Sequence, residues 1–427
     1  MKTKLVIFGI TGDLSTRKLL PALAQIISTG DFDDLSVVGV SRQDINVNEL
    51  LSAKLGDTSL ESRITGFGMD TTNLEDYRRL KEFINLGDEE QLLLYLSVPP
   101  GASSGIVELL GQAGLNMPEA KLLLEKPFGI DVESAKQMIN HVGTYYDETQ
   151  VYRIDHYLAK EMTQNIIAFR GGNALFDHIW NSGAIEKIEV VAQEEIGIEG
   201  RTQFYEQTGA LRDVLQGHLM QLLALVLMDV PRGMDWDDAT KMRLEALNAV
   251  ALADPSQAVR GQYAGYRDEV GNTSSQTETF AAVHLTSNAS QWQGVPILLA
   301  TGKAMDKKTT EVRVHFRKSH ESQTNCLIFN IQPHEGIEIE LHTKRPGYDH
   351  ELESQTLSFM YPAEKKLPDA YEQVIVDAIR SRKSLFASSE EVLRAWEILT
   401  PVQESWSSRT DDLKLYEKGS SLDAIIA

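Results

Sequence analysis

One histidine in the middle of the chain has the spacing of an acid–base group in a cleft. His218 belongs to a stripe of helical period, so its imidazole faces a core or a cleft rather than water. The other members of the stripe are Leu211, Leu215, Leu222 and Leu225. An imidazole has a reference pKa of about 6.5, so one that a carboxylate orients can act as a general base near neutral pH. The alternative is a core histidine bonded to a backbone carbonyl.

A nine-residue run from Arg153 to Glu161 places a carboxylate, an imidazole and an ammonium group close together. We expect this run to follow a strand and to enter a helix. Asp155 can cap that helix, while His156 and Lys160, four residues apart, share one helical face. That face suits a phosphate group. The alternative is an ordinary helix cap with solvated charges.

Further charged residues stand near the ends of predicted elements. Glu194 ends a predicted strand, and Asp213 begins the helix that carries His218. Carboxylates accept hydrogen bonds from sugar hydroxyls, although both groups could instead compensate a helix dipole or be solvated in a loop. A later basic cluster would focus the electric field on an anionic ligand, with a solvated loop as the alternative. Its members are Lys303, Lys307 and Lys308.

The first predicted strand ends in a turn with two glycines, reading Gly-Ile-Thr-Gly-Asp-Leu over residues 9–14. Glycines at such a turn let the backbone approach a pyrophosphate, and the free N–H groups of the next helix complete an anion site. The spacing differs from G-x-G-x-x-G, so a plain turn is the alternative. The residues that we assign to a dinucleotide here are Gly9, Thr11, Gly12, Asp13 and Leu14.

Two further strand ends complete the predicted cofactor site. The second strand is followed by Ser41, Arg42 and Gln43, where an NAD site has an Asp or Glu for the ribose. Arg42 can pair with a 2′-phosphate, so NADP is favoured; Gln43 could still bond the ribose of NAD, and Arg42 could be a solvated charge. Lys126 ends another strand, and Pro127 restricts it to an extended conformation, so we expect it beside the nicotinamide.

The elements that must position these residues indicate two domains. Up to a boundary near residues 146–150, apolar runs alternate with helical segments, which is typical of a Rossmann-like α/β domain; we predict domains at 1–148 and 149–427. The predicted strands of the first are 4–8, 35–40, 91–98 and 121–124. Its predicted helices are 14–28, 74–85, 105–112 and 132–142.

The remainder of the chain predicts a larger domain with a mostly antiparallel β-sheet backed by helices. A helix at 157–169 precedes a strand at 185–193 and an apolar helix at 209–228. The later predicted strands are 277–285, 295–301, 311–316, 326–331 and 337–342. Helices at 370–381 and 389–399 follow them.

Composition excludes several classes of protein. The 427 residues carry 41 Lys and Arg against 62 Asp and Glu, a net charge of −21, which disfavours nucleic acids and anionic membranes as partners. Cys326 is the single cysteine, so an intrachain disulfide and a Cys-rich metal site are excluded, and we predict no metal site. No run of 18 apolar residues occurs. We expect a cytoplasmic protein.

Taken together, these motifs resemble the signatures of the glucose-6-phosphate dehydrogenase family. The likeness rests on the glycine turn at 9–14, Glu-Lys-Pro-Phe-Gly at 125–129, and Arg-Ile-Asp-His-Tyr-Leu-Ala-Lys-Glu at 153–161, and it continues in order to Asp-Ala-Tyr-Glu at 369–372. The resemblance implies oxidation of the C1 hydroxyl of glucose 6-phosphate to a lactone, with hydride transfer to NADP⁺. This reaction is the entry to the oxidative pentose phosphate pathway.

The resemblance also implies roles for individual residues. His218 matches the histidine that removes the C1 hydroxyl proton, and Asp155 matches the aspartate that orients it and stabilises the imidazolium. The phosphate-binding set corresponds to His156, Tyr157 and Lys160. Other matches to substrate contacts are Lys126, Glu194, Asp213, Lys303, and either Lys307 or Lys308, of which we choose Lys308. Lys126 also matches a cofactor contact, and family members assemble as homodimers or homotetramers through the large sheet.

Two other functions compete with this interpretation. A sugar or inositol dehydrogenase could also place Glu-Lys-Pro after a parallel strand, but the phosphate set argues against it. A nucleotide-binding regulator could keep the fold without catalysis, but the chain retains every catalytic position of the family. Comparing free glucose with its 6-phosphate separates the first alternative, and nucleotide binding without turnover would indicate the second.

Overall fold

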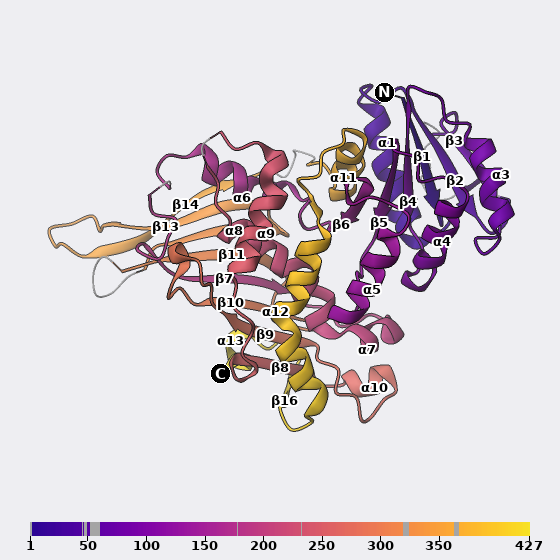
Figure 1. The fold of residues 1–427 in the computed structure, drawn as a ribbon. Helices are drawn as coiled ribbons and strands as arrows, with labels where there is room; N and C mark the ends of the chain where they lie inside the picture. Colours follow the sequence, from indigo (N-terminus) through magenta and orange to yellow (C-terminus); the bar gives the residue numbers. More distant parts are fainter. Residues whose placement is uncertain are drawn as a thin grey trace. The chain divides into compact units, whose positions relative to one another are not determined.

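The computed structural model describes residues 2–44, 46, 49–51, 60–176, 178–231, 233–318, 324–362 and 367–427. The chain forms two compact units (Figure 1). The first comprises Met1–Gly129, Glu133–Ala159 and Pro368–Ser389, and the second Ile130–Val132, Lys160–Leu367 and Glu390–Ala427. The sequence predicted a single boundary after residue 148, and this division into units differs from that prediction. The first unit runs on to Ala159 and regains a segment from near the end of the chain.

The first unit is built on a seven-stranded sheet in the order β15-β6-β5-β4-β1-β2-β3. Strands β1 to β6 are parallel, and β15 pairs antiparallel with β6. This is the doubly wound order of dinucleotide-binding folds, so the Rossmann-like prediction is confirmed. The strands are β1 (Lys2–Phe8), β2 (Leu35–Ser41), β3 (Ile64–Gly68), β4 (Glu90–Leu96), β5 (Ala120–Leu124), β6 (Val151–Ile154) and β15 (Phe386–Ala387).

Helices cover this sheet because its central strands are apolar on both faces. In β1 the last four residues are completely buried, which requires cover on each side. The helical segments are η1 (Ser15–Leu19), α1 (Leu20–Ser28), α3 (Leu74–Ile84), α4 (Pro100–Gln112), α5 (Val132–Gly143), η2 (Glu148–Gln150) and α11 (Ala370–Ile379). Helix α11 shares its buried side chains with α1 in one hydrophobic cluster. A late segment of the chain therefore completes the core of the first unit.

The second unit contains a nine-stranded sheet in the order β14-β13-β12-β11-β7-β10-β9-β8-β16. Only the β7–β10 and β8–β16 pairings among these strands are parallel, so the sheet is mostly antiparallel as predicted. The strands are β7 (Ile185–Gln193), β8 (Ala258–Tyr263), β9 (Phe280–Leu285), β10 (Ile297–Gly302), β11 (Thr309–Phe316), β12 (Cys326–Gln332), β13 (Gly336–Lys344), β14 (Leu352–Met360) and β16 (Leu413–Tyr416).

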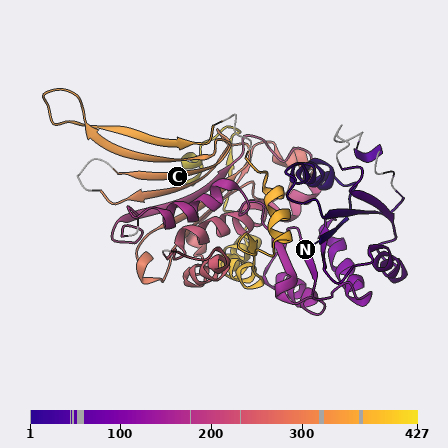
Figure 2. The ribbon, with the colours of Figure 1, turned by 90° about the horizontal axis from the view of Figure 1, so that it is seen from above.

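The longer helices of the second unit lie along one face of this sheet (Figure 2). Segment η3 packs on β7, β9 and β10, while α6 packs on β12. The longer helical segments are α6 (Glu161–Gly172), α7 (Thr202–Ala210), η3 (Leu211–Leu219), α8 (Met220–Leu227), α9 (Ala239–Ala249) and α12 (Ser389–Ser408). The short segments are η4 (Trp236–Asp238), η5 (Pro255–Gln257), α10 (Tyr266–Val270), η6 (Ser290–Trp292) and α13 (Leu422–Ile426).

The helical run Thr202–Leu227 is the one stretch among the described residues with the length and hydropathy of a membrane span. Its apolar window is 72% buried inside the structure. All eight residues of α8, at its end, are buried. A helix that is apolar on every side and enclosed by protein is a core helix of a globular unit.

Candidate active site

A cavity of about 500 Å³ opens at the carboxyl ends of β1, β2 and β4 in the first unit. In a doubly wound sheet this is the edge where a dinucleotide binds. The predicted cofactor residues that line the cavity are Gly9, Thr11, Gly12, Ser41, Arg42 and Gln43. The cavity lining does not include Asp13, Leu14 or Lys126. The Asp13 carboxylate instead pairs with the Arg17 guanidinium at 2.7 Å.

The glycine turn is shaped by its contact with the end of β4. Gly9 has a φ of +80°, and a Cβ added there would lie 2.2 Å from the carbonyl oxygen of Ser97. The Ser15 hydroxyl oxygen lies 2.9 Å from both the Gly9 carbonyl oxygen and the Ser97 hydroxyl oxygen. The turn is therefore held on β4 with its backbone facing the cavity. A close backbone surface at a helix start fits a pyrophosphate.

Replacing Gly9 by alanine is expected to destabilise the turn by at least about 1–3 kcal/mol, because positive φ and the Ser97 contact both oppose a side chain. Gly30→Ala is the matched control, since Gly30 has a φ of +77° but open space around its Cα. Urea unfolding and dinucleotide titration should show a larger loss for Gly9→Ala in both measurements. Equal losses for the two variants would show that the Ser97 contact is unimportant.

The end of the cavity beside β2 carries a guanidinium group together with the Asp44 carboxylate. Arg42 and Gln43 are exposed, and the Ser41 hydroxyl donates to the Gln43 carbonyl oxygen, which fixes the bend after β2. Hydrogen bonds from the Thr72 backbone and hydroxyl lower the pKa of Asp70, and Arg42 adds a smaller electrostatic effect. A glycine cradle with polar and charged side chains at one end fits the phosphates and ribose of a dinucleotide.

The structure also adds residues that the sequence analysis missed in this cavity. Ser97, Val98 and Pro99 line it immediately after β4, and Asp44 and Thr71 line it beyond β2 and β3. A signal for the first three was available, because β4 is a predicted parallel strand and its carboxyl end must face the same edge as the glycine turn. For Asp44 and Thr71 the sequence offers no comparable signal.

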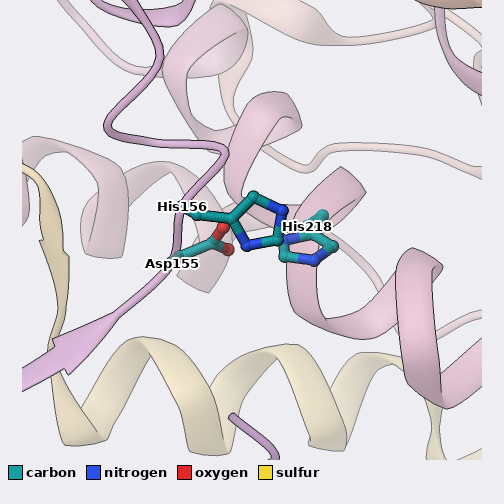
Figure 3. A group of neighbouring side chains, drawn as sticks. All are labelled: Asp155, His156 and His218. Atoms are coloured by element: carbon teal, nitrogen blue, oxygen red, sulfur yellow. The ribbon is translucent and has the colours of Figure 1, made fainter. Parts of the chain in front are cut away.

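Lys126 and Asp155 follow neighbouring strands of the same sheet. Strands β5 and β6 pair in parallel, with Leu124 opposite Arg153, so both residues stand at the carboxyl edge. Asp155 is 1% exposed, and its Oδ1 accepts a hydrogen bond from the Tyr157 backbone N–H at 2.8 Å. This bond forms a local turn. Figure 3 shows Asp155 and His156 on the segment that follows β6.

The predicted helix start at residue 157 is wrong. The Asp155 turn occupies residues 155–160, Lys160 has an extended backbone, and α6 begins only at Glu161. His156 and Lys160 therefore do not share a helical face. His156 instead packs against two aromatic rings, with centroid distances of 5.0 Å to Tyr157 and 6.3 Å to Tyr371 of α11.

In the second unit, a carboxylate and an ammonium group meet at the ends of two parallel strands. Glu194 follows β7 and Lys303 follows β10, and the Lys303 ammonium donates to the Glu194 carboxylate. Lys303 is 4% exposed, and its ammonium lies 5.3 Å from the ring centroid of Tyr205. The Tyr416 hydroxyl donates to the Lys303 carbonyl oxygen at 2.7 Å. The pair presents both hydrogen-bond donors and acceptors.

His218 and Asp213 stand on η3, whose start is fixed by a buried carboxylate (Figure 3 shows His218). Oε1 of Glu278 accepts from the Leu211 N–H at 3.0 Å, and the Glu278 carbonyl oxygen accepts from the Ala210 N–H at 2.9 Å. Gly209, with a φ of +64°, gives the sharp bend between α7 and η3. Glu278 thus fixes the start of η3, which carries both His218 and Asp213.

The side chains on η3 combine burial with polarity. His218 is 7% exposed, which agrees with the apolar stripe that predicted it in a core or a cleft. Burial raises the pKa of Tyr205 well above its usual value, and the nearby Asp213 carboxylate adds to this effect. The hydroxyl of Tyr205, on α7, is neutral at pH 7 and therefore stays neutral in more alkaline solution too.

The lysines of the predicted phosphate and substrate sets have different surroundings. The Lys160 ammonium donates to the Gln332 side-chain oxygen, and the Gln332 amide donates to the Thr310 hydroxyl at 2.9 Å. Lys307 and Lys308 are exposed at the turn before β11, so the structure does not distinguish between them. Tyr205, Glu278 and Gln332 are polar neighbours that sequence reasoning missed. Their contacts join residues far apart in the chain, for which local spacing gives no signal.

Two family models match the chain in order and together span nearly all of it. Residues 6–165 match the model described as "Glucose-6-phosphate dehydrogenase, NAD binding domain", and residues 167–424 match "Glucose-6-phosphate dehydrogenase, C-terminal domain". The chain belongs to the glucose-6-phosphate dehydrogenase family. The family predicted from the motifs is therefore confirmed.

Curated relatives and solved structures agree with this membership. The chain is 34% identical over 460 aligned residues to the glucose-6-phosphate 1-dehydrogenase of Dickeya dadantii (strain 3937), covering 97% of this chain and 94% of the relative. It is 35% identical over 443 aligned residues to the glucose-6-phosphate 1-dehydrogenase of Borreliella burgdorferi, covering 94% of this chain and 92% of the relative.

Two solved structures resemble the whole chain. One is a glucose-6-phosphate dehydrogenase in complex with its substrate glucose-6-phosphate, with a TM-score of 0.92, 29% identity and coverage of 98% of this chain and 95% of that chain. The other is the glucose-6-phosphate 1-dehydrogenase of Mycobacterium avium, with a TM-score of 0.87, 31% identity and coverage of 98% and 94%.

Proposed function

We propose that this protein is a glucose-6-phosphate 1-dehydrogenase that oxidises the C1 hydroxyl of glucose 6-phosphate to 6-phosphogluconolactone and reduces NADP⁺. The observation that carries the proposal is the agreement between family membership over nearly the whole chain and a cavity at the predicted glycine turn. The substrate follows from the relatives' names and from the phosphate-binding motif at residues 153–161.

In this reaction His218 acts as the base that takes the proton of the C1 hydroxyl. Its burial on η3 supports this role, since an imidazole enclosed by apolar residues needs a specific polar partner. Asp155 orients the imidazole and stabilises the imidazolium that forms. The carboxylate is itself fixed by its bond to the Tyr157 N–H, which limits its freedom to turn away.

The remaining residues of the site bind the sugar phosphate. His156, Tyr157 and Lys160 bind the phosphate, and the exposed Lys308 adds a second positive charge. The residues that bind the sugar are Lys126, Glu194, Asp213 and Lys303. Glu194 and Lys303 support each other, because their ion pair fixes both side chains before a hydroxyl arrives.

The cofactor is NADP⁺, with NAD⁺ as a weaker substitute. When bound, the nicotinamide supplies the acceptor for the hydride that leaves C1. The glycine turn with Thr11 holds the pyrophosphate, Ser41, Arg42 and Gln43 hold the adenosine end, and Lys126 contacts both cofactor and substrate. The cradle at Gly9 and the guanidinium of Arg42 support this assignment.

The proposal is tested by mixing the protein with NADP⁺ and glucose 6-phosphate and following reduced cofactor by its absorbance. Free glucose in place of its 6-phosphate tests the phosphate set, because an enzyme that relies on three phosphate contacts should lose most of its efficiency. No reduced cofactor at high protein concentration would reject the proposed reaction. Equal efficiency with free glucose would reject the phosphate assignment.

Arg42→Ala is expected to lower kcat/KM with NADP⁺ by about 10- to 100-fold, the value of one or two charge-assisted hydrogen bonds. The efficiency with NAD⁺, which lacks the 2′-phosphate, should change little. Steady-state kinetics with both cofactors measure the two effects. A variant that loses the same factor with NAD⁺ would show that Arg42 does not select the cofactor.

We also propose that the protein works in the cytoplasm as a homodimer or homotetramer assembled through the large sheet. The exposed apolar side chains on β14, including Leu357 and Phe359, support an assembly surface on that sheet. Sedimentation analysis of the purified chain tests the assembly, and a monomer at all concentrations would contradict it.

A further inference from the structure

A partly buried carboxylate at the carboxyl edge of the first sheet has no role in the proposed reaction. Glu125 follows β5 directly, one residue before Lys126. The Tyr95 hydroxyl on the neighbouring β4 donates to Oε1 of Glu125 at 2.5 Å. Tyr95 is completely buried, and its register opposite Leu123 keeps its hydroxyl near the end of β5. The position of this carboxylate is therefore fixed from two adjacent strands.

The charged and titratable groups that act on Glu125 come from its own segment and from β4, β6 and α11, and the His156 imidazole stacks on Tyr371 of α11. Tyr95 faces it from β4, Lys126 adjoins it on the same segment, Asp155 faces it from the end of β6, and Tyr371 faces it from α11. The cluster contains two carboxylates and one ammonium group. Its net charge is therefore negative when Glu125 is ionised and neutral when Glu125 holds a proton.

The topology indicates which half of a dinucleotide lies over this cluster. Arg42 and Gln43 follow β2, so the adenosine half lies over the β1–β3 side of the sheet. A dinucleotide crosses the sheet edge at the point where the strand order reverses, between β1 and β4. The nicotinamide half must then lie over β4, β5 and β6, where Tyr95, Glu125 and Asp155 stand.

We propose that the ionised carboxylate of Glu125, held by Tyr95, makes the site bind the oxidised dinucleotide in preference to the reduced one. This inference rests on the proposed function. The oxidised nicotinamide ring carries one positive charge, which the hydride removes. The adjacent Lys126 ammonium disfavours that charge, and ionised Glu125 offsets the repulsion. NADP⁺ then binds more tightly than NADPH, which favours release of the reduced product.

The proton on Glu125 gives this preference a pH dependence. Burial raises the pKa of Glu125 to about 7, while the Tyr95 hydrogen bond and Lys126 act in the opposite direction. Above that pH the carboxylate is ionised and the preference for NADP⁺ is present. As the pH falls through about 7, the carboxylate takes up a proton and the preference is lost.

The experiment measures the Kd of NADP⁺ and of NADPH for the full chain at about pH 6 and about pH 8, which bracket the expected transition. Quenching of protein fluorescence reports NADP⁺, and the nicotinamide fluorescence reports NADPH. The quantity of interest is the ratio of the two Kd values. The 2′-phosphate of the dinucleotide titrates at about pH 6, but both NADP⁺ and NADPH carry it, so its effect cancels in the ratio of the two Kd values.

In the wild type the preference for NADP⁺ should be about tenfold greater at the higher pH. A factor of that size is the effect of one unit charge at roughly 7–12 Å from the nicotinamide in a partly buried site. Glu125→Gln should lose that tenfold change between the two pH values. Glu119→Gln is the matched control, because it removes the same charge from an exposed position at the opposite end of β5. It should retain the wild-type ratio.

Tyr95→Phe provides a test that a structural role would not reproduce. Loss of a donor to the ionised carboxylate should raise the pKa of Glu125, so the transition in the Kd ratio should move to higher pH. A wild-type ratio independent of pH, a Glu125→Gln variant with the wild-type ratio, or a Tyr95→Phe variant with an unmoved transition would each overturn the inference. Wild-type protein that binds neither dinucleotide would instead overturn the proposed function itself.

Discussion

Replacing His218 by asparagine is expected to lower kcat by about 10²–10⁴-fold, the usual contribution of a general base. Asparagine can fill part of the space of the imidazole and can hydrogen-bond, but it cannot accept the C1 proton. The Kd for glucose 6-phosphate should change little, because the phosphate and sugar contacts come from other residues. Steady-state kinetics give kcat, and calorimetric titration with the sugar phosphate gives the Kd.

The same substitution at a second histidine separates loss of the base from a general effect. His284 is exposed on β9, so His284→Asn should keep wild-type kcat. Thermal unfolding of both variants checks that the fold is intact. This check is needed because His218 is buried, whereas His284 is exposed. Near-normal turnover in His218→Asn would remove it as the base and would leave the reaction without an acceptor for the proton.

Much of the first unit could be predicted because its strands are continuous apolar runs. The predicted strand 4–8 corresponds to β1, and 121–124 to β5, with ends that differ by one or two residues. The strand β3 was missed, because its sequence Ile-Thr-Gly-Phe-Gly has two glycines and little alternation. The local sequence pattern could not show that α11 joins this unit, because that depends on its contact with α1, which lies near the other end of the chain.

Two elements of the second unit differ from what the local sequence pattern predicts. The strand β14 was missed because its residues are nearly all exposed, so no buried face imposes an alternating pattern. The predicted helix end at residue 399 was wrong, since α12 continues to Ser408 through Pro401. A proline inside a helix costs about 3 kcal/mol, but the turns beyond it bury Val402 and Trp406, which offsets that cost.

The candidate site was predictable to the extent that its residues lie on short motifs. The glycine turn and the residues after β2 lie in one cavity because the carboxyl ends of parallel strands share an edge. The cap of η3 by Glu278 was not predictable, because it joins residues 67 positions apart. Asp155 shows an intermediate case. Its side chain does accept a backbone N–H as predicted, but the bond closes a turn before the helix rather than capping it.

This turn allows the charge of Asp155 to be removed without loss of its structural contact. Asp155→Asn keeps an oxygen for the Tyr157 N–H, whereas Asp155→Ala removes it. We expect Asp155→Asn to lower kcat by about 10²–10⁴-fold, because an imidazole without its partner carboxylate loses orientation and charge stabilisation. Its free energy of unfolding should stay close to that of the wild type. Asp155→Ala should have a similar kcat and be less stable by about 1–3 kcal/mol.

The pH dependence of kcat separates an electrostatic role of Asp155 from a purely local one. A nearby carboxylate raises the pKa of an imidazole, because it favours the charged form. Without that charge the pKa of His218 should fall, so the rise of kcat with pH should begin at lower pH in Asp155→Asn. A local structural role would lower kcat at every pH by the same factor. An unshifted profile in a stable Asp155→Asn variant would therefore show that the carboxylate does not act on the base.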